Sequence, residues 1–236
     1  MLRWLPLFAG IMPLVAMFGA FAIGVAYETL PDCNPIIDGC RSISATGRKP
    51  PGSFLFRAIM LPQAILLAFT WYLSLLWLRK VRADLGQGMQ ITIVIAAIVN
   101  AVALIIYVTF LGTTEPIYEF MRRTGIYFGF LGQALAQILI AIALLKTSLK
   151  PLSRAMLSIM IFVFSIGILN LVLKATLADP DPAENRIEWI ASIMMQIWFF
   201  VLFVAWRRTE ADFSVRIGPA RAAEHGLVGQ GPQERD

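Results

Sequence analysis

The sequence predicts an all-α membrane protein, a polytopic bundle of six transmembrane helices with a long first external loop. Of its 236 residues, 58% are hydrophobic and only 15% are charged. A soluble domain usually carries about 25% charged residues. The apolar residues also form long uninterrupted blocks rather than periodic stripes, and only lipid accommodates that pattern at this length.

Six apolar blocks are visible, and each has about the 20 residues needed to cross roughly 30 Å of hydrocarbon. Inside lipid the backbone must satisfy its own hydrogen bonds, so we predict that each block is a helix. The blocks are Trp4–Ala26, Phe54–Leu78, Ile91–Leu111, Ile126–Leu145, Ala155–Leu177 and Ile187–Trp206.

The ends of the chain differ in character. The first block has a longer apolar core than a signal peptide, and no small-x-small cleavage site follows it, so we predict a retained helix. Residues 1–208 then form one transmembrane domain. From Thr209 the chain is polar and unpatterned, which is typical of a disordered tail over 209–236.

An even number of spans places both termini on one side of the membrane. With the termini in the cytoplasm, eleven Lys and Arg residues lie inside or near the inner face and eight lie outside. This bias predicts cytoplasmic termini and a cytoplasmic tail. The net charge of +5 arises mainly beside the ends of spans, where it suits anionic lipid headgroups, and no aromatic-interleaved basic surface suggests nucleic acid.

Cys33 and Cys40 are the only two cysteines, and both lie in the loop after the first span. A matched pair in a short polar loop favours a disulfide in an oxidising compartment, the alternative being two free thiols. Zinc needs four ligands, and the single histidine, His225, lies in the tail. We therefore expect no metal and no cofactor, and a loop Glu28–Ser53 that is periplasmic, extracellular or lumenal.

The same loop is rich in hydroxyls and cations between Ser42 and Pro51. Hydroxyl groups, backbone amides and the cations Arg48 and Lys49 are suited to a phosphate headgroup at the membrane face. The alternative is an ordered cap held by the disulfide.

The run Ser42-Ile43-Ser44-x-x-Gly47, followed by Pro50-Pro51, resembles the loop signature of the Frag/DRAM/Sfk family of six-helix membrane proteins. That family includes the damage-regulated autophagy modulators, the post-GPI-attachment remodelling protein and the N-terminal part of the yeast cell-wall protein Cwh. Glu188-Trp189 is a second match, and the resemblance spans residues 4–208. Members often carry a histidine three residues before a glycine in the fourth helix, whereas this chain has Arg122 before Gly125.

The resemblance implies a lipid-linked function: maturation of lipid-anchored proteins, phospholipid organisation or membrane trafficking. It implies no established catalytic mechanism. The short tail and compact loops suggest a bacterial relative, which would lie in the plasma (inner) membrane and would not act on GPI anchors.

Several charged residues are expected near the membrane surface that carries the loop. Arg57 lies just inside the second span and Glu188 just inside the sixth, where they either pair across the bundle or extend to the headgroups. The remaining charges of this face are expected to be solvated loop residues. They are Glu115, Glu119, Arg122, Arg123, Glu184 and Arg186.

Amide side chains that interrupt the apolar spans include Asn100, Gln133, Gln137, Asn170 and Gln196. Gly125, Gly129, Gln133 and Gln137 recur every four residues and share one helix face. Small residues and amides on one face favour close helix packing with interhelical hydrogen bonds. The alternative is a polar cavity for a lipid headgroup.

The leading hypothesis is a lipid-handling protein that binds a lipid headgroup, or a lipid-anchored or membrane protein, at the outer membrane face, without established catalysis. One alternative is an enzyme that remodels lipid anchors or acyl chains, with Glu188, Glu115 or Glu119 as base. Another is a small transporter or lipid scramblase with a path along Asn100, Gln133, Gln137 and Asn170. The candidate site residues are Ser42, Ser44, Gly47, Arg48, Arg57, Arg122, Glu188 and Trp189.

Overall fold

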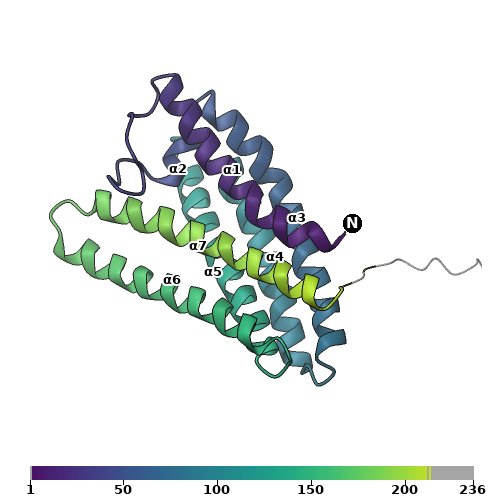
Figure 1. Ribbon diagram of the computed structural model, residues 1–236. Helices are drawn as coiled ribbons and strands as arrows, with labels where there is room; N and C mark the ends of the chain where they lie inside the picture. The colour runs from purple at the N-terminus through teal and green to yellow at the C-terminus, as the bar shows by residue number, and fades with distance from the viewer. Residues whose placement is uncertain (1, 212, 214–236) are drawn as a thin grey trace, which may run out of the picture.

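The computed structural model describes residues 2–211 and 213, and within them it is all-helical, as predicted. Six helices are long and apolar enough to cross a membrane, and Figure 1 shows them as one bundle. They are α1 (Leu5–Ala26), α3 (Gly52–Val81), α4 (Gln87–Thr109), α5 (Pro116–Leu144), α6 (Lys150–Thr176) and α7 (Asp181–Arg208). Two short helices, η1 (Leu2–Trp4) and α2 (Ile43–Thr46), complete the described chain.

Every long helix after α1 begins before its apolar block, most of all α5. It begins at Pro116, ten residues before the predicted start at Ile126. Proline is favoured in the first turn of a helix because its fixed φ suits the helix and the missing N–H is not needed there. Glu119, Arg122 and Arg123 therefore lie in α5, and Glu184 and Arg186 in α7, and not in loops as expected. Arg123 and Arg186 are exposed, as expected of solvated charges, whereas Arg122 is buried.

The two ends of the bundle differ. The disulfide end carries the loop of residues 27–51, the start of α5, the end of α6 and the start of α7. The terminal end carries η1 and the end of α7, and its core is packed with aromatic rings. Trp71 lies against Trp198 and Phe199, and Trp77 lies against Trp206. These rings close the interior of the bundle at the terminal end.

Helices α4 and α5 cross at close range, and two glycines permit it. A Cβ on Gly125 would lie 2.6 Å from the backbone nitrogen of Tyr107, and one on Gly132 would lie 2.8 Å from the carbonyl oxygen of Ala96. Both are backbone atoms that cannot rotate away. This crossing supports the small-residue packing predicted for this face of the helix.

Asn100 joins three helices, and its loss is expected to loosen the bundle. Its Nδ2 donates to the Gly129 carbonyl at 2.9 Å, and its Oδ1 accepts from the Trp71 indole at 3.1 Å. We predict that Asn100→Leu lowers the free energy of unfolding by about 1–2 kcal/mol. Reversible unfolding in SDS mixed micelles, followed by tryptophan fluorescence, measures this change.

The matched control is Asn170→Leu on α6, because the Asn170 side chain makes no hydrogen bond among the described residues. Its unfolding midpoint is expected to match that of the wild type. Equal losses in the two variants would contradict a structural role specific to Asn100.

The chain just beyond α7 packs back on the bundle. The Trp77 indole donates to Thr209 Oγ1 at 2.9 Å, and the Phe213 ring lies 4.8 Å from the ring of Trp206. The rest of the tail predicted over 209–236 lies outside the described residues.

Candidate functional site

The second half of α6 stands apart from α5 and creates a groove. The buried residues of α6 are Ser153, Met156 and Met160, all in its first half. There the Ser153 hydroxyl donates to the Ala141 carbonyl of α5 at 2.6 Å. Beyond this contact a groove of about 1050 Å³ opens between α5, α6, α7 and the loop after α1. Figure 1 shows α6 lying beside α7 at the edge of the bundle.

The lining of the groove is polar near the loop and apolar further along the helices. The loop contributes Arg41, Ser42, Ser44 and Arg48; α5 contributes Arg122, Ile126, Tyr127 and Phe130; α6 contributes Gly167, Asn170 and Lys174; and α7 contributes Glu184, Ile187, Glu188 and Ala191. One cavity therefore joins charged groups to a hydrocarbon-like wall.

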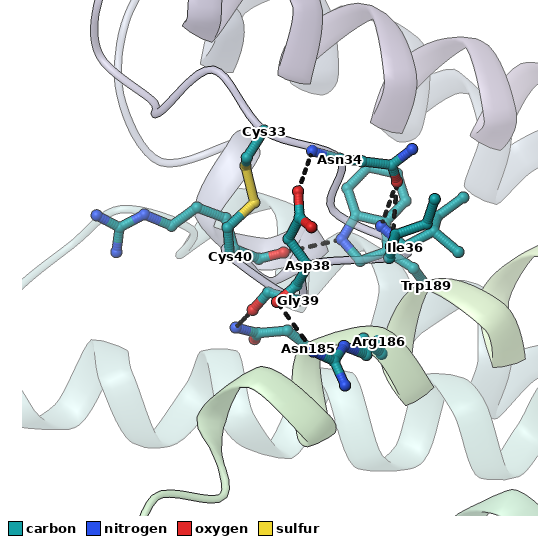
Figure 2. The surroundings of a disulfide bond; sticks show 11 residues. Cys33, Asn34, Ile36, Asp38, Gly39, Cys40, Asn185, Arg186 and Trp189 are labelled. Atoms are coloured by element: carbon teal, nitrogen blue, oxygen red, sulfur yellow. Dashed lines mark hydrogen bonds between the residues drawn. A yellow bond between two sulfur atoms is a disulfide. The ribbon is translucent and has the colours of Figure 1, made fainter.

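A disulfide joins Cys33 and Cys40, as predicted, and no free cysteine is present among the described residues. Figure 2 shows how the segment between them folds on itself. The Asn34 backbone N–H donates to the Asp38 carboxylate at 2.8 Å, and the Asn34 side chain accepts from the N–H of Ile36 at 3.0 Å. In the described part of the chain no group of three or more His, Cys, Asp or Glu residues is arranged to hold a metal.

The segment that the disulfide closes, residues 33–40, is fixed to the first turns of α7 (Figure 2). Asn185 donates to the Gly39 carbonyl at 2.8 Å, and the Trp189 indole donates to the Arg41 carbonyl at 2.9 Å. Gly39 has φ +65°, and a Cβ there would lie 1.9 Å from the Pro182 carbonyl oxygen. Only glycine allows this approach, so the loop has a defined position over α7.

Trp189 holds the loop from inside the bundle. Its side chain is 0% exposed and lies against the rings of Phe18 and Phe21, at centroid distances of 5.1 and 5.9 Å. It does not line the groove. Of the predicted pair Glu188-Trp189, the carboxylate thus faces the groove while the indole positions the loop.

Ser44 lies at the centre of the polar end. Ser42 caps α2 by accepting from the Ala45 N–H at 3.2 Å, and its hydroxyl lies 3.2 Å from the Ser44 hydroxyl. The Arg48 guanidinium donates to Ser44 Oγ at 3.1 Å, and the Ser44 backbone N–H donates to the Glu188 carboxylate at 3.4 Å. Ser44 therefore links a cation and a carboxylate that come from distant parts of the sequence.

A second guanidinium lies on the α5 side of the groove. Arg122 is only 8% exposed and donates to Glu119 at 3.2 Å, and Arg123 donates to the same carboxylate at 2.6 Å. The Nε of Arg122 is buried without a hydrogen-bond partner among the described residues. Burial, and after it the charge of Arg122, lowers the pKa of the Arg48 guanidinium. The cations here are crowded, and an anion between them would relieve that crowding.

The chain matches the Frag1/DRAM/Sfk1/Cwh43P N-terminal domain over residues 1–209. This protein belongs to that family. The match covers all six long helices and the disulfide-bonded loop. Together these findings show an integral, multi-pass membrane protein. No curated protein and no solved structure matches the chain.

The residues that resemble the Frag1/DRAM loop signature divide into two groups. Ser42 and Ser44 line the groove, whereas Gly47 is buried beneath α2. A Cβ on Gly47 would lie 2.6 Å from a methyl group of Leu111 and 2.9 Å from the ring of Phe56. Gly47 thus permits close packing of the loop on the helices and does not contact the groove.

The pairing considered for Arg57 and Glu188 does not occur. Arg57 donates instead to the Leu111 carbonyl, just after α4. Leu111 follows the C-cap residue Phe110 and is buried, so its carbonyl needs a hydrogen-bond donor such as this guanidinium. Arg57 lies outside the groove, while Arg48, Arg122 and Glu188 of the candidate set line it.

This member of the Frag1/DRAM family also has a smaller cavity of about 90 Å³ inside the bundle. Ile126, Phe130 and Glu188 line both this cavity and the groove, so the two meet there. Its polar lining residues are Gln63, Asn100, Tyr107, Gln133, Ser192 and Gln196.

The alternative of a polar cavity therefore applies to some of the predicted amides and not to others. Asn100 and Gln133 line the inner cavity and Asn170 lines the groove, whereas Gln137 donates to the Met195 carbonyl at 3.0 Å as a packing contact. Gln63 and Ser192 were missed, although a polar residue within an apolar span is itself a signal.

Proposed function

We propose that the protein binds a membrane lipid by its headgroup at the disulfide end, with the acyl chains along the wall formed by α5, α6 and α7. The groove supports this proposal because it unites a charged end with an apolar wall in one cavity. A phospholipid has the same division into a charged headgroup and a hydrocarbon part.

The contacts within the groove suit such a ligand. At its polar end Ser44, Arg48 and Arg122 offer a hydroxyl and two guanidinium groups, which form strong charge-assisted hydrogen bonds with phosphate. Along its wall Phe130, Gly167 and Ala191 present apolar surface. Because the groove runs between membrane-spanning helices, a lipid can enter it from the side without leaving the bilayer.

We place the disulfide end at the outer membrane face and both termini in the cytoplasm. The disulfide supports this orientation because such bonds persist in oxidising compartments. The excess of Lys and Arg near the other ends of the spans supports it as well. In a bacterium the bound lipid would come from the outer leaflet of the plasma (inner) membrane, or would be the anchor of a lipid-anchored protein.

The contacts of Ser44 favour binding over acyl transfer. A serine nucleophile needs a base that accepts its hydroxyl proton. Ser44 Oγ instead contacts the Ser42 hydroxyl and the Arg48 guanidinium, and Glu188 accepts from the Ser44 backbone N–H. The aromatic core at the terminal end likewise favours binding over transport through the interior of the bundle.

Filling the groove tests the proposal. Gly167 lines the groove, and a Cβ there would have no atom within 4 Å, so Gly167→Trp places an indole where the acyl chain is expected. Native mass spectrometry of protein extracted gently from its own membrane should show a co-purifying lipid in the wild type and about tenfold less in this variant.

Gly88→Trp is the matched control, because Gly88 is also helical with no atom within 4 Å of its Cβ position, yet lies outside the groove. It should retain lipid at the wild-type level. Equal lipid retention in Gly167→Trp and Gly88→Trp would refute binding in the groove.

A further inference from the structure

The charges around the groove are balanced in number. Five cationic side chains line it, Arg41, Arg48, Arg122, Arg123 and Lys174, and so do five carboxylates, Glu119, Asp179, Asp181, Glu184 and Glu188. The groove as a whole therefore carries no formal excess of either sign. A purely anionic headgroup would meet as many carboxylates as cations.

Part of this charge is already compensated inside the protein. Glu119 pairs with Arg122 and Arg123, and Lys174 pairs with Glu184 at 3.1 Å. Arg41, Asp179 and Asp181 form no salt bridge with any described residue, and the same holds for Arg48 and Glu188, the two that contact Ser44. These two opposite charges lie on either side of Ser44 and are left for a ligand.

Ser44 explains why the two charges do not neutralise each other. Its hydroxyl holds the guanidinium of Arg48, and its backbone N–H holds the carboxylate of Glu188. The residue is only 8% exposed and lies in α2, which packs against α1, α3 and α7. Glu188 is partly buried, and a partly buried charge without a counter-ion is costly, so a ligand that supplies its counter-ion gains affinity there, and less at the exposed Arg48.

We propose that the lipid bound in the groove has a phosphoethanolamine-type headgroup, with its phosphate on Arg48 and its primary ammonium on Glu188. This inference rests on the proposed lipid binding and specifies its ligand. The phosphate and ammonium of such a headgroup are joined by two carbons, which suits two protein charges separated by one serine. Arg122, with its unpartnered Nε, lies on the α5 side of the same groove as a second donor to the phosphate.

The surroundings of Glu188 favour a primary ammonium over trimethylammonium. A quaternary ammonium is usually bound in a cage of aromatic faces. Trp189, the adjacent aromatic residue, is turned into the bundle against Phe18 and Phe21. The aromatic residues of the groove, Tyr127 and Phe130, both belong to α5, so they offer ring faces from one side only and do not form a cage around Glu188. A primary ammonium can instead donate hydrogen bonds to the Glu188 carboxylate.

Lipid competition on the full-length protein tests this assignment. Delipidated protein is mixed with micelles that contain equal amounts of phosphatidylethanolamine, phosphatidylcholine and phosphatidylglycerol with the same acyl chains, and native mass spectrometry counts the bound species. The wild type should bind phosphatidylethanolamine about tenfold better than either competitor, as expected for one added charge-assisted hydrogen-bonded pair.

Substitutions that each remove one charge and keep a polar side chain separate the two roles. Glu188→Gln should abolish the preference for phosphatidylethanolamine over phosphatidylglycerol. Arg48→Gln should instead weaken the binding of all three lipids. Asp84→Asn is the control, because Asp84 is an exposed carboxylate paired with Arg82 between α3 and α4, outside the groove. This variant should keep the wild-type preference.

The outcomes distinguish the headgroup assignment from lipid binding itself. Equal binding of the three lipids, or a preference for phosphatidylglycerol, with binding lost in Gly167→Trp, would overturn the ethanolamine assignment and leave the groove as a lipid site. A phosphatidylethanolamine preference that survives Glu188→Gln would overturn it too. No bound lipid in any variant would overturn both.

Discussion

Gly132→Ala is expected to destabilise the bundle by about 1–3 kcal/mol, the typical range for overpacking a tight core. The added Cβ would lie 2.8 Å from the Ala96 carbonyl oxygen and 2.8 Å from the Asn100 backbone nitrogen. Since both are backbone atoms of α4, the two helices must move apart. That movement strains the hydrogen bond from Asn100 to the Gly129 carbonyl. Unfolding in SDS mixed micelles measures the loss.

The same substitution three residues earlier should have the opposite sign. A Cβ on Gly129 would lie 3.8 Å from the Ala103 Cβ and 3.9 Å from the Leu104 nitrogen, ordinary contact distances. Alanine is the better helix former by about 1 kcal/mol. Gly129→Ala should therefore leave the stability unchanged or raise it slightly. Losses of similar size at both positions would show that the crossing of α4 and α5 does not depend on Gly132.

The number of helices was predictable because the bilayer sets their length and lipid demands apolar side chains. Their ends were less predictable, because hydropathy marks where hydrocarbon ends and not where the helix does. At α5 the helix continues through Glu119, Arg122 and Arg123 to Pro116. The loop disulfide was predictable because two cysteines share one short polar segment.

Part of the polar site was also predictable. Ser44, Arg48, Arg122 and Glu188 were candidates by residue type and position, and the fold brings them to one groove. Arg57 is also a basic residue predicted near the same membrane surface, but its side chain reaches the Leu111 carbonyl and not the groove. The direction in which a side chain points depends on how its helix is rotated and which helices it packs against. A single sequence does not reveal either.

The groove itself left no mark in the sequence. It exists because the second half of α6 packs little against α5, so residues such as Gly167 and Asn170 face open space. A helix that faces lipid and a helix that faces a lipid-filled groove have the same apolar composition. Hydropathy therefore predicts α6 as a span and gives no information about what it encloses.

Trp189→Ala is expected to release the loop and to remove lipid binding together with it. The buried ring packs against Phe18 and Phe21, and its indole donates to the Arg41 carbonyl at 2.9 Å. Truncating a buried tryptophan costs about 3–5 kcal/mol. Because Arg41 leads directly into Ser42 and α2, the loss should free the polar end of the groove. Hydrogen exchange of residues 27–51 should accelerate markedly, and lipid retention should fall.

Two further variants separate the ring from the hydrogen bond. Trp189→Phe keeps most of the packing and removes only the bond to Arg41, so it should lose about 1 kcal/mol and keep some loop protection. Trp4→Ala is the control, because Trp4 is 38% exposed at the terminal end and pairs with Phe203. It should leave the hydrogen exchange of the loop unchanged.

Wild-type loop protection in Trp189→Ala would mean that the disulfide and the contacts to Asn185 and Arg186 alone hold the loop. The proposed lipid site would then depend on α2 and not on Trp189.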